Sequence, residues 1–448
     1  MKKHPNVLFL MSDEHRFDVS GFHGNQVVRT PNLDRLAKDA VVFDNAYTPS
    51  PICVPGRQAM MTGKFPRDCG SEKFKSDIPP GSMTWARRFA QHGYSAVCCG
   101  KLHHTGPDQM QGWTKRPFGD MELSPWAIED TVQPQFETNR DLKDWKKWSD
   151  TKECLRAGVG KGRYQIFDEQ ATAAALSVLD NHFLDPMYDR PSPQQPLLLK
   201  VSLLHPHYPY FADEELFRYY LNRVEAFIDE PVFDHPFLSR RQVKSSEGAE
   251  KRDLIRATAA YYAMVEKLDQ HFGEVLNKIE SIGENLDDWI IVYTTDHGEM
   301  LGEHGVWEKQ KFFEGSARVP FFIRYPKAFS AKRVEENVNL CDLFATFCEL
   351  CHLEPPKEEN ASRSLVPLMN GDNEDWLSQQ HNETVSQFGG TNVMIKRNAL
   401  KYQYYGEEMP EVLFDLERDP KETSNLINDP TYKDALPAFR TRLKELGF

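Results

Sequence analysis

The chain has 448 residues, of which 40% are apolar and 27% are charged, and its formal net charge at pH 7 is -13. This composition is typical of a globular enzyme, and the length favours a large α/β domain with a smaller unit over one small domain. The negative charge argues against nucleic acid as a partner, because phosphate backbones bind to surfaces rich in Lys and Arg. It does not exclude an anionic substrate, which needs only a local cluster of cations.

The start of the chain does not match a targeting segment. Its first apolar run, from Val7 to Met11, is shorter than the ~7–15 apolar residues of a signal peptide, and Ser12, Asp13 and Glu14 follow at once. No stretch approaches the ~20 apolar residues of a membrane helix, so a membrane is not expected as a partner. The chain as given is therefore predicted to be cytoplasmic, although a chain trimmed of its leader would look the same.

Apolar runs and helical periodicity predict strands that alternate with helices over most of the chain. Strands are expected at 6–11, 40–45, 94–99, 197–204, 289–295 and 320–325, and helices at 32–40, 252–282 and 340–353. This alternation predicts a large, mostly parallel sheet sandwiched by helices. The active site of such a sheet belongs at the C-terminal ends of its strands.

Other segments depart from this alternation. Residues 106–162, with Trp113, Trp126, Trp145 and Trp148, and residues 208–249 are irregular, and they are expected either to build a substrate pocket or to pack over the sheet. After a catalytic domain at 1–370, residues 371–448 are predicted to form a C-terminal α+β subdomain with a small antiparallel sheet and a terminal helix. Its strands are expected at 384–388, 393–396, 401–405 and 411–415, and its helix near 433–446.

The eight cysteines do not require disulfides in a chain of this length. Cys98 and Cys99 end a strand-like run and are expected to be buried thiols. Cys348 and Cys351 have the spacing of a metal knuckle, but no second pair lies near them, so core packing is the favoured interpretation.

Cys53 heads the stretch Cys53-Val54-Pro55-Gly56-Arg57. This stretch suggests a reactive residue at the start of a helix, where free N–H groups and the positive end of the helix dipole favour negative charge. Arg57 follows one turn later and can point at the same spot. On these residues alone, a buried Cys beside a structural Arg is the favoured interpretation.

Two predicted strands end in acidic residues, one in Asp13 and Glu14 and the other in Asp296 and His297. Buried carboxylates at strand ends cost several kcal/mol unless a partner neutralises them, and a divalent cation is the natural partner. Oxygen ligands with one imidazole favour Ca²⁺, Mg²⁺ or Mn²⁺ over zinc.

Together with further motifs, these residues resemble the formylglycine-dependent sulfatases of the alkaline phosphatase superfamily, and the likeness covers nearly the whole chain. The motifs occur in the family's order, and they are Asn6-Val7-Leu8-Phe9 with Asp13, residues 30–34, Cys53-x-Pro55-x-Arg57 with Thr62-Gly63, Gly93-Tyr94, Gly100-Lys101-Leu102-His103, residues 205–209, Asp296-His297-Gly298, residues 301–305 with Trp307 and Lys309, and residues 413–416, 419–420 and 425–426. The pattern is most similar to the iduronate-2-sulfatase and choline-sulfatase-like branches.

The resemblance implies a role for each matching residue. Cys53 would be oxidised to formylglycine by a maturation enzyme, and its hydrate would be the nucleophile. One divalent metal, with Ca²⁺ favoured and Mg²⁺ or Mn²⁺ open, would be bound by residue 53 and by Asp13, Glu14, Asp296 and His297. Arg57 would hold the formylglycine hydrate, and Lys101 and Lys309 would hold sulfate oxygens. His103 would act on the hydroxyl of residue 53, and His207 would assist the leaving alcohol.

The chemistry of a sulfate monoester accounts for these residue types. Its negative charge repels a nucleophile, so a metal and two lysines would neutralise it. One hydroxyl of the hydrate would attack sulfur and form a covalent sulfate ester. The other, once deprotonated, would restore the aldehyde and expel sulfate, which a plain Ser or Cys cannot do. Histidines suit the proton transfers.

Two features depart from the family pattern. Gly56 stands where the maturation signal usually has Ser or Ala, although conversion is still expected. In Lys101-Leu102-His103-His104, most branches of the family favour His103, whereas iduronate-sulfatase-like spacing favours His104.

The expected substrate is a small sulfated carbohydrate. One alternative is a phosphonate monoester or phosphodiester hydrolase of the same superfamily, which would share the formylglycine and the metal. A second alternative is a non-catalytic homologue that binds sulfated glycans. A generic Cys–His hydrolase comes third, because it does not explain the acids at the strand ends.

Overall fold

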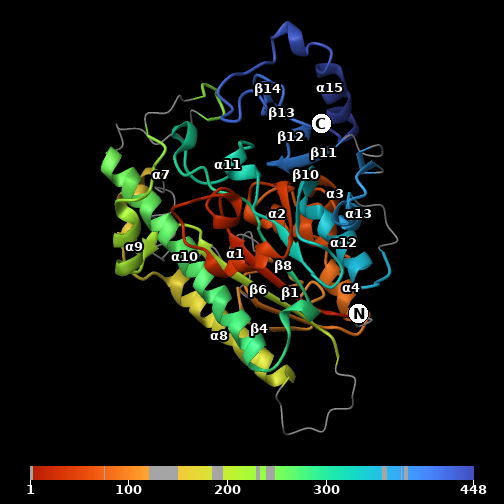
Figure 1. Ribbon diagram of the computed structural model, residues 1–448. Helices are drawn as coiled ribbons and strands as arrows, with labels where there is room; N and C mark the ends of the chain where they lie inside the picture. Colours follow the sequence, from red (N-terminus) through yellow and green to blue (C-terminus); the bar gives the residue numbers. More distant parts are fainter. Residues whose placement is uncertain are drawn as a thin grey trace.

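The computed structural model describes residues 4–74, 76–120, 150–183, 195–228, 233–238, 248–355, 361–374, 376–377 and 382–448. An eight-stranded sheet lies at its centre, with a smaller sheet beyond one end (Figure 1). The strand order in the large sheet is β10-β2-β9-β8-β1-β6-β3-β4. Neighbouring strands are parallel except at β9, which is antiparallel to both β2 and β8.

Most inner strands of the large sheet are buried and largely apolar, as expected where helices cover both faces. The strands of the large sheet are β1 (Asn6–Asp13), β2 (Val41–Tyr47), β3 (Ser95–Gly100), β4 (Lys115–Gly119), β6 (Leu197–Pro206), β8 (Trp289–Thr295), β9 (Phe322–Arg324) and β10 (Lys332–Asn339). A separate two-stranded pair is formed by β5 (Gly158–Val159) and β7 (Phe211–Ala212).

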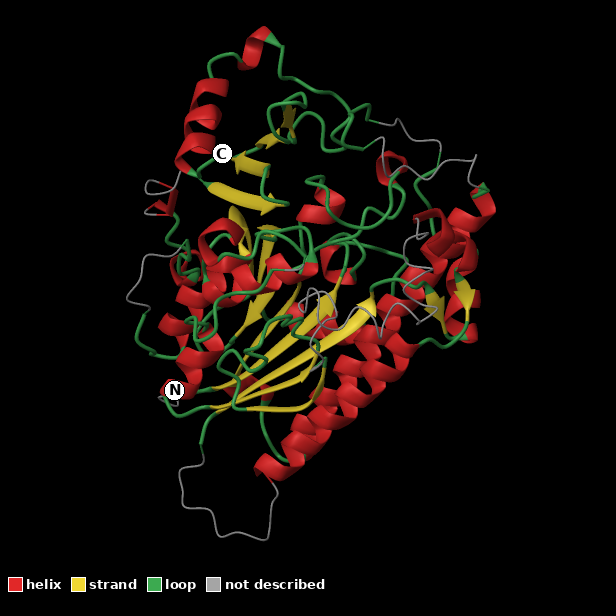
Figure 2. Ribbon diagram, turned by 180° about the vertical axis from the view of Figure 1, so that it is seen from behind, coloured by secondary structure: helices red, strands yellow, loops and turns green. Residues whose placement is uncertain are grey.

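Helices cover both faces of the large sheet. The helices of the described part of the chain are α1 (Pro31–Lys38), α2 (Cys53–Thr62), α3 (Pro66–Cys69), α4 (Trp85–Gln91), α7 (Asp150–Arg156), α8 (Arg163–Phe183), α9 (Glu214–Leu221), α10 (Lys251–Ser281), α11 (Glu314–Ala317), α12 (Leu343–Leu350), α13 (Val366–Asn370) and α15 (Leu436–Glu445). Figure 2 shows the long helices α8 and α10 side by side along the sheet.

Strand β1 contributes to a separate core on each face, because successive side chains of a strand point in opposite directions. Phe9 packs with residues of α2, α4 and α12, whereas Leu8 and Leu10 pack with residues of α1, α8 and α10. All three side chains are fully buried. The mostly parallel sheet sandwiched by helices is therefore confirmed.

The elements that the apolar patterns missed have identifiable reasons. The edge strands β4 and β10 carry several charged residues, which is common where a strand has only one neighbour. Helix α8 buries a narrow stripe of small residues that includes Ala171 and Ala175, so its helical periodicity is weak. The predicted helix at 340–353 is divided into a 3₁₀ turn at Leu340–Asp342 and helix α12.

The smaller sheet is antiparallel, as predicted, and consists of β11 (Glu383–Phe388), β12 (Asn392–Arg397), β13 (Leu400–Tyr404) and β14 (Val412–Asp415). Helix α15 covers one face of it with Leu436, Phe439 and Leu443. The boundary at 370 between two domains stays a prediction.

Three further expectations can be compared with the structure. Trp113 is buried in the core, whereas Trp126, Trp145 and Trp148 lie outside the described residues. All eight cysteines are free and buried, and Cys348 and Cys351 pack in the core as predicted. None of the described helices combines the length and the apolar composition that a membrane crossing requires.

Candidate active site

The predicted site residues lie together because their strands are neighbours. Strands β8, β1, β6 and β3 are adjacent and parallel, so their carboxyl ends meet at one edge of the sheet. Asp13 ends β1, and Asp296 follows β8. Lys101 follows β3, and His207 follows β6.

Cys53 is the first residue of α2, and Ile52 before it is extended. The first N–H groups of a helix have no partner within the helix, so this position favours negative charge on residue 53. Its Sγ lies 3.1 Å from His297 Nε2 and 3.7 Å from Asp13 Oδ1. The side chain is 1% exposed.

Arg57 joins α2 to the ends of two strands. Its Nε donates to Asp296 Oδ2 at 2.7 Å, and a terminal nitrogen donates to Asp13 Oδ2 at 3.1 Å. The remaining N–H groups point to Ser202 Oγ and to two backbone carbonyl oxygens. The whole guanidinium group is therefore used to hold protein atoms, with both carboxylates among them.

Two buried lysines bring positive charge to the cluster. Lys101 Nζ forms a short ion pair with Asp13. Lys309 Nζ donates to Glu14 Oε2 at 2.8 Å and lies 2.5 Å from His207 Nε2. Together with Arg57, these lysines face the three carboxylates at an edge where water has little access.

The hydrogen bonds of His297 and His207 indicate where each ring carries its proton. Their Nδ1 atoms face the carbonyl oxygens of Gly298 and Tyr208, at 3.0 Å and 2.6 Å. A carbonyl oxygen only accepts, so Nδ1 is the donor in both rings. The Nε2 lone pairs therefore face the cluster, as a metal ligand or a proton acceptor requires.

His103 and His104 have different surroundings. Burial lowers the pKa of His103 well below its usual value, and the nearby Lys101 lowers it further. Burial and the cation of Arg116 lower the pKa of His104 to about 3, and its Nδ1 lies 3.1 Å from the Gln109 carbonyl oxygen. His103 thus lies within reach of the charges of the cluster, whereas His104 faces a different part of the protein.

Two of the predicted site residues have a strained backbone. Glu14 and His103 have φ angles of 64° and 61°, in the left-handed region that side chains other than glycine rarely adopt. Such residues cost on the order of 1–3 kcal/mol and persist where the surrounding contacts impose them. Asp120 imposes this conformation at His103, because its carboxylate accepts the N–H groups of Leu102 and His103 at 2.8 Å and 2.7 Å.

The side chains present fit a divalent cation that prefers oxygen ligands. The potential ligand atoms of Asp13, Cys53, Asp296 and His297 all lie within 4.8 Å of one another, whereas Glu14 groups with Asp13 and His207. Burial raises the pKa of Glu14 well above its usual value, although Lys309 opposes this shift. An added cation would favour the ionised carboxylate, and three carboxylates with one imidazole match Ca²⁺, Mg²⁺ or Mn²⁺.

The Cys53 thiol itself is poorly suited to act as a nucleophile. Burial raises its pKa to about 11, and the Asp13 carboxylate contributes to this rise. A thiol with this pKa stays protonated near pH 7, whereas a Cys–His hydrolase needs a thiolate. This environment therefore argues against the generic Cys–His hydrolase.

Sequence patterns did not identify the residues that hold the site residues in place through hydrogen bonds. Ser202 accepts a hydrogen bond from Arg57 at 3.0 Å. Asp168 accepts the N–H groups of Leu204 and His205 at 2.6 Å and 3.0 Å, and so fixes the strand end that leads to His207. Asp168 lies on α8, the helix that periodicity did not predict, so no local pattern could identify its role.

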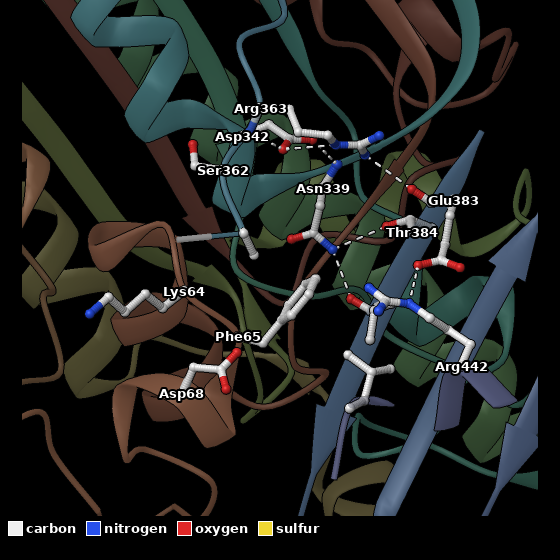
Figure 3. Close-up of a pocket in the computed structure, with 13 residues that line it drawn as sticks. Lys64, Phe65, Asp68, Asn339, Asp342, Ser362, Arg363, Glu383, Thr384 and Arg442 are labelled. Atoms are coloured by element: carbon white, nitrogen blue, oxygen red, sulfur yellow. Dashed lines mark hydrogen bonds and ion pairs between the residues drawn. The ribbon is translucent and has the colours of Figure 1, made fainter. Parts of the chain in front are cut away.

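A cavity of about 650 Å³ lies elsewhere, between the large sheet's helices and the C-terminal sheet (Figure 3). None of the predicted site residues lines it. Its polar side chains bond to one another: Asn339 Nδ2 donates to Thr384 Oγ1 at 3.1 Å, and Arg442 Nε donates to Glu383 Oε1 at 2.8 Å. These contacts connect the two parts of the chain.

Comparisons with known proteins agree with this arrangement. The sulfatase family matches residues 5–353, and the family described as N-sulphoglucosamine sulphohydrolase, C-terminal, matches residues 302–447. An arylsulfatase of Clostridium perfringens is 29% identical over 99% of this chain and 94% of its own length. A choline-sulfatase of Rhizobium meliloti is 30% identical over 95% of this chain and 83% of its own length. An N-acetylglucosamine-6-O-sulfatase of Bacteroides thetaiotaomicron is 25% identical, over 96% and 84%.

Solved structures share the fold. A phosphonate monoester hydrolase of Agrobacterium radiobacter has a TM-score of 0.78 at 21% identity, covering 99% of this chain and 95% of its own. A protein solved in complex with its substrate D-glucosamine-2-N,6-O-disulfate has a TM-score of 0.77 at 20% identity, covering 99% and 97%. The family match over most of the length and the sulfatase relatives lead to one conclusion: the chain belongs to the sulfatase family of sulfuric ester hydrolases.

Proposed function

We propose that this sulfatase hydrolyses the sulfate monoester of a small sulfated carbohydrate at residue 53, after a maturation enzyme has converted Cys53 to formylglycine. One observation carries the proposal: the Cys53 side chain, at the start of α2, lies within 4.8 Å of ligand atoms of Asp13, Asp296 and His297. A formylglycine hydrate at this point would place a hydroxyl where the other residues are arranged to act on it.

The roles proposed for the site residues are those that the family resemblance implies, and the positions of the residues are compatible with them. Asp13, Glu14, Asp296, His297 and residue 53 would hold one divalent metal, with Ca²⁺ favoured, and the bound metal would neutralise charge on the sulfate group. The ammonium groups of Lys101 and Lys309 would bind sulfate oxygens.

The histidines and Arg57 would handle protons and orientation. His103 would take a proton from the residue 53 hydroxyl, and His207, next to Lys309, would pass a proton to the leaving alcohol. Arg57 would orient Asp13 and Asp296 and, through them, residue 53. The cytoplasmic location stays a prediction.

Two relatives support a carbohydrate substrate. One is named N-acetylglucosamine-6-O-sulfatase, and one solved neighbour binds a disulfated glucosamine. The phosphonate monoester hydrolase fold is shared as well, so this activity is the second candidate.

The test combines a rate comparison with mass spectrometry of native protein. We expect faster turnover of p-nitrophenyl sulfate than of p-nitrophenyl phenylphosphonate, and an aldehyde in the peptide that contains residue 53. Faster phosphonate turnover would favour the second candidate. An intact thiol in protein that turns over no sulfate ester would favour the non-catalytic homologue, and a Cys53→Ala variant with full activity would contradict the role of formylglycine.

A further inference from the structure

His103 and His207 each contact an aromatic side chain that lies outside the sulfatase motifs. The Phe74 ring lies edge-on to His103, with 5.3 Å between the ring centroids. The Tyr164 ring lies edge-on to His207, with 5.7 Å between the centroids. Phe74 is 36% exposed and Tyr164 is partly exposed, so both keep surface that a ligand can contact.

The loop that carries Phe74 is fastened to the loop that carries His103. Asp77 accepts hydrogen bonds from Gln111 Nε2, at 2.8 Å, and from the N–H group of Gly106. These bonds connect the segment that follows Phe74 to the loop that follows His103, and the Phe74 ring itself contacts the His103 ring. A binding surface built in this way is pre-organised, which lowers the entropy lost when a ligand binds.

Tyr164 is held next to His207 by its helix. It lies in the first turn of α8, and Asp168 one turn later binds the N–H groups of Leu204 and His205 at the end of β6. The same strand end leads directly to His207. The second aromatic ring is therefore fixed relative to the reaction centre as well.

A cation stands beside this second ring. Arg163 is exposed, and its guanidinium carbon lies 5.4 Å from the Tyr164 ring centroid. Its neighbour Lys161 is neutralised by Glu169 at 2.6 Å, whereas Arg163 has no acidic partner within the described part of the chain. A free guanidinium group attracts a sulfate or carboxylate and repels a quaternary ammonium group.

We propose that Phe74, Tyr164 and Arg163 form the subsite for the leaving alcohol, and that this alcohol is a sugar with a second anionic group. The aromatic rings contact the C–H faces of the sugar, and Arg163 binds the second sulfate or carboxylate. This inference rests on the proposed sulfatase reaction at residue 53, since the rings border the histidines assigned to that reaction. It predicts that choline sulfate is a poor substrate, because its leaving group carries a positive charge that Arg163 would repel.

Steady-state kinetics on matched substrates tests the subsite. The substrates are glucosamine 6-O-sulfate, glucosamine-2-N,6-O-disulfate and choline sulfate, with p-nitrophenyl sulfate as a reporter of the reaction itself. We expect Arg163→Ala to lower kcat/KM about tenfold for the disulfate and less than about twofold for the monosulfate, as for loss of one charged contact. Phe74→Ala and Tyr164→Ala lower kcat/KM for both sugars. Ile166→Ala, an exposed position on α8, is the matched control and leaves all rates unchanged.

The experiment distinguishes failure of the proposed subsite from failure of the proposed sulfatase reaction. If p-nitrophenyl sulfate is turned over but Arg163→Ala affects both sugars equally, or choline sulfate is preferred, the subsite is wrong and the sulfatase reaction stands. If no sulfate ester is turned over, calorimetry of the two sugars with Cys53→Ala protein decides about the subsite. Tighter binding of the disulfate that disappears with Arg163→Ala supports it, and equal binding overturns it.

Discussion

Arg57 Nε donates a hydrogen bond to Asp296 Oδ2 at 2.7 Å, and this contact joins helix α2 to the end of strand β8. The same guanidinium group reaches Asp13 at the end of β1. One planar side chain thus sets the separation of two carboxylates that belong to different strands. Its geometry, and not only its charge, matters at this position.

Replacing Arg57 by Lys tests this geometric role. The ammonium group keeps the charge but cannot bind both carboxylates in fixed directions. We expect metal affinity and kcat/KM to fall roughly 10–100-fold, as when a residue that orients metal ligands is removed. Calorimetric metal titration measures the first effect. Arg35→Lys, in an exposed pair with Glu280, is the control, and unchanged metal affinity in Arg57→Lys would contradict the role.

Removal of divalent metal is expected to inactivate and destabilise the protein. Asp13, Glu14 and Asp296 are buried. A bound metal would stabilise their ionised forms beyond what Arg57, Lys101 and Lys309 already provide. Readdition of Ca²⁺ at about 100 times its Kd should restore roughly 2.7 kcal/mol, because only the folded protein holds the site. Thermal unfolding with Ca²⁺, Mg²⁺ and Mn²⁺ in turn identifies the metal. A melting temperature unaffected by a chelator would contradict the metal site.

The burial of Lys200 is expected to make the stability of the protein depend on pH. It is fully buried, its Nζ lies 5.1 Å from the Phe9 ring centroid, and burial lowers its pKa from the usual 10.5 to about 7. Between pH 7 and pH 10.5 Lys200 is protonated in the unfolded chain but neutral in the folded protein, so the free energy of unfolding rises with pH in this range. The cost of burying the charged Lys200 is therefore largest below about pH 7 and becomes small as the pH approaches 10.

The variant Lys200→Met should therefore stabilise the protein by roughly 2–4 kcal/mol near pH 7 and by much less near pH 10. Urea unfolding at the two pH values measures the difference. An equal effect at both would show that the Lys200 pKa is not lowered.

A buried ion network joins the C-terminal sheet to the catalytic part. Lys401 Nζ, on β13, lies 2.8 Å from both Glu314 Oε1 and Glu422 Oε1. Lys401→Met would leave two buried carboxylates without their shared cation, which is expected to cost about 3–5 kcal/mol of unfolding free energy. The exposed Lys433→Met is the control. Adding Glu422→Gln to Lys401→Met should recover part of the loss, and a single variant as stable as the parent would refute the network's importance.

Gly56 can be explained by its surroundings. A Cβ atom at this position would lie 2.8 Å from the Ser50 carbonyl oxygen, which is too close. Gly→Ala inside a helix usually stabilises by about 1 kcal/mol, but the clash should reverse the sign and destabilise by roughly 1–3 kcal/mol. Differential scanning calorimetry checks the direction. Gly160→Ala, where the nearest atom is 3.5 Å away, should be nearly neutral.

The sequence was informative where apolar runs end in charged residues. Strand β1 ends in Asp13 and Asp296 directly follows β8, so the meeting of these acids at one edge of the sheet could be predicted. The antiparallel direction of β9 could not, because a short apolar strand reads the same in either direction. Asp168, Tyr164 and Phe74 were missed because their positions depend on how distant segments pack.

Every residue of α2, from Cys53 to Thr62, is buried. The proposed oxidation of Cys53 requires that an enzyme contact the side chain and its flanking backbone, and both are buried in the folded protein. If Cys53 is converted to formylglycine, the conversion is therefore expected before this segment folds. The rate of folding around α2 would then limit the fraction of molecules that become active.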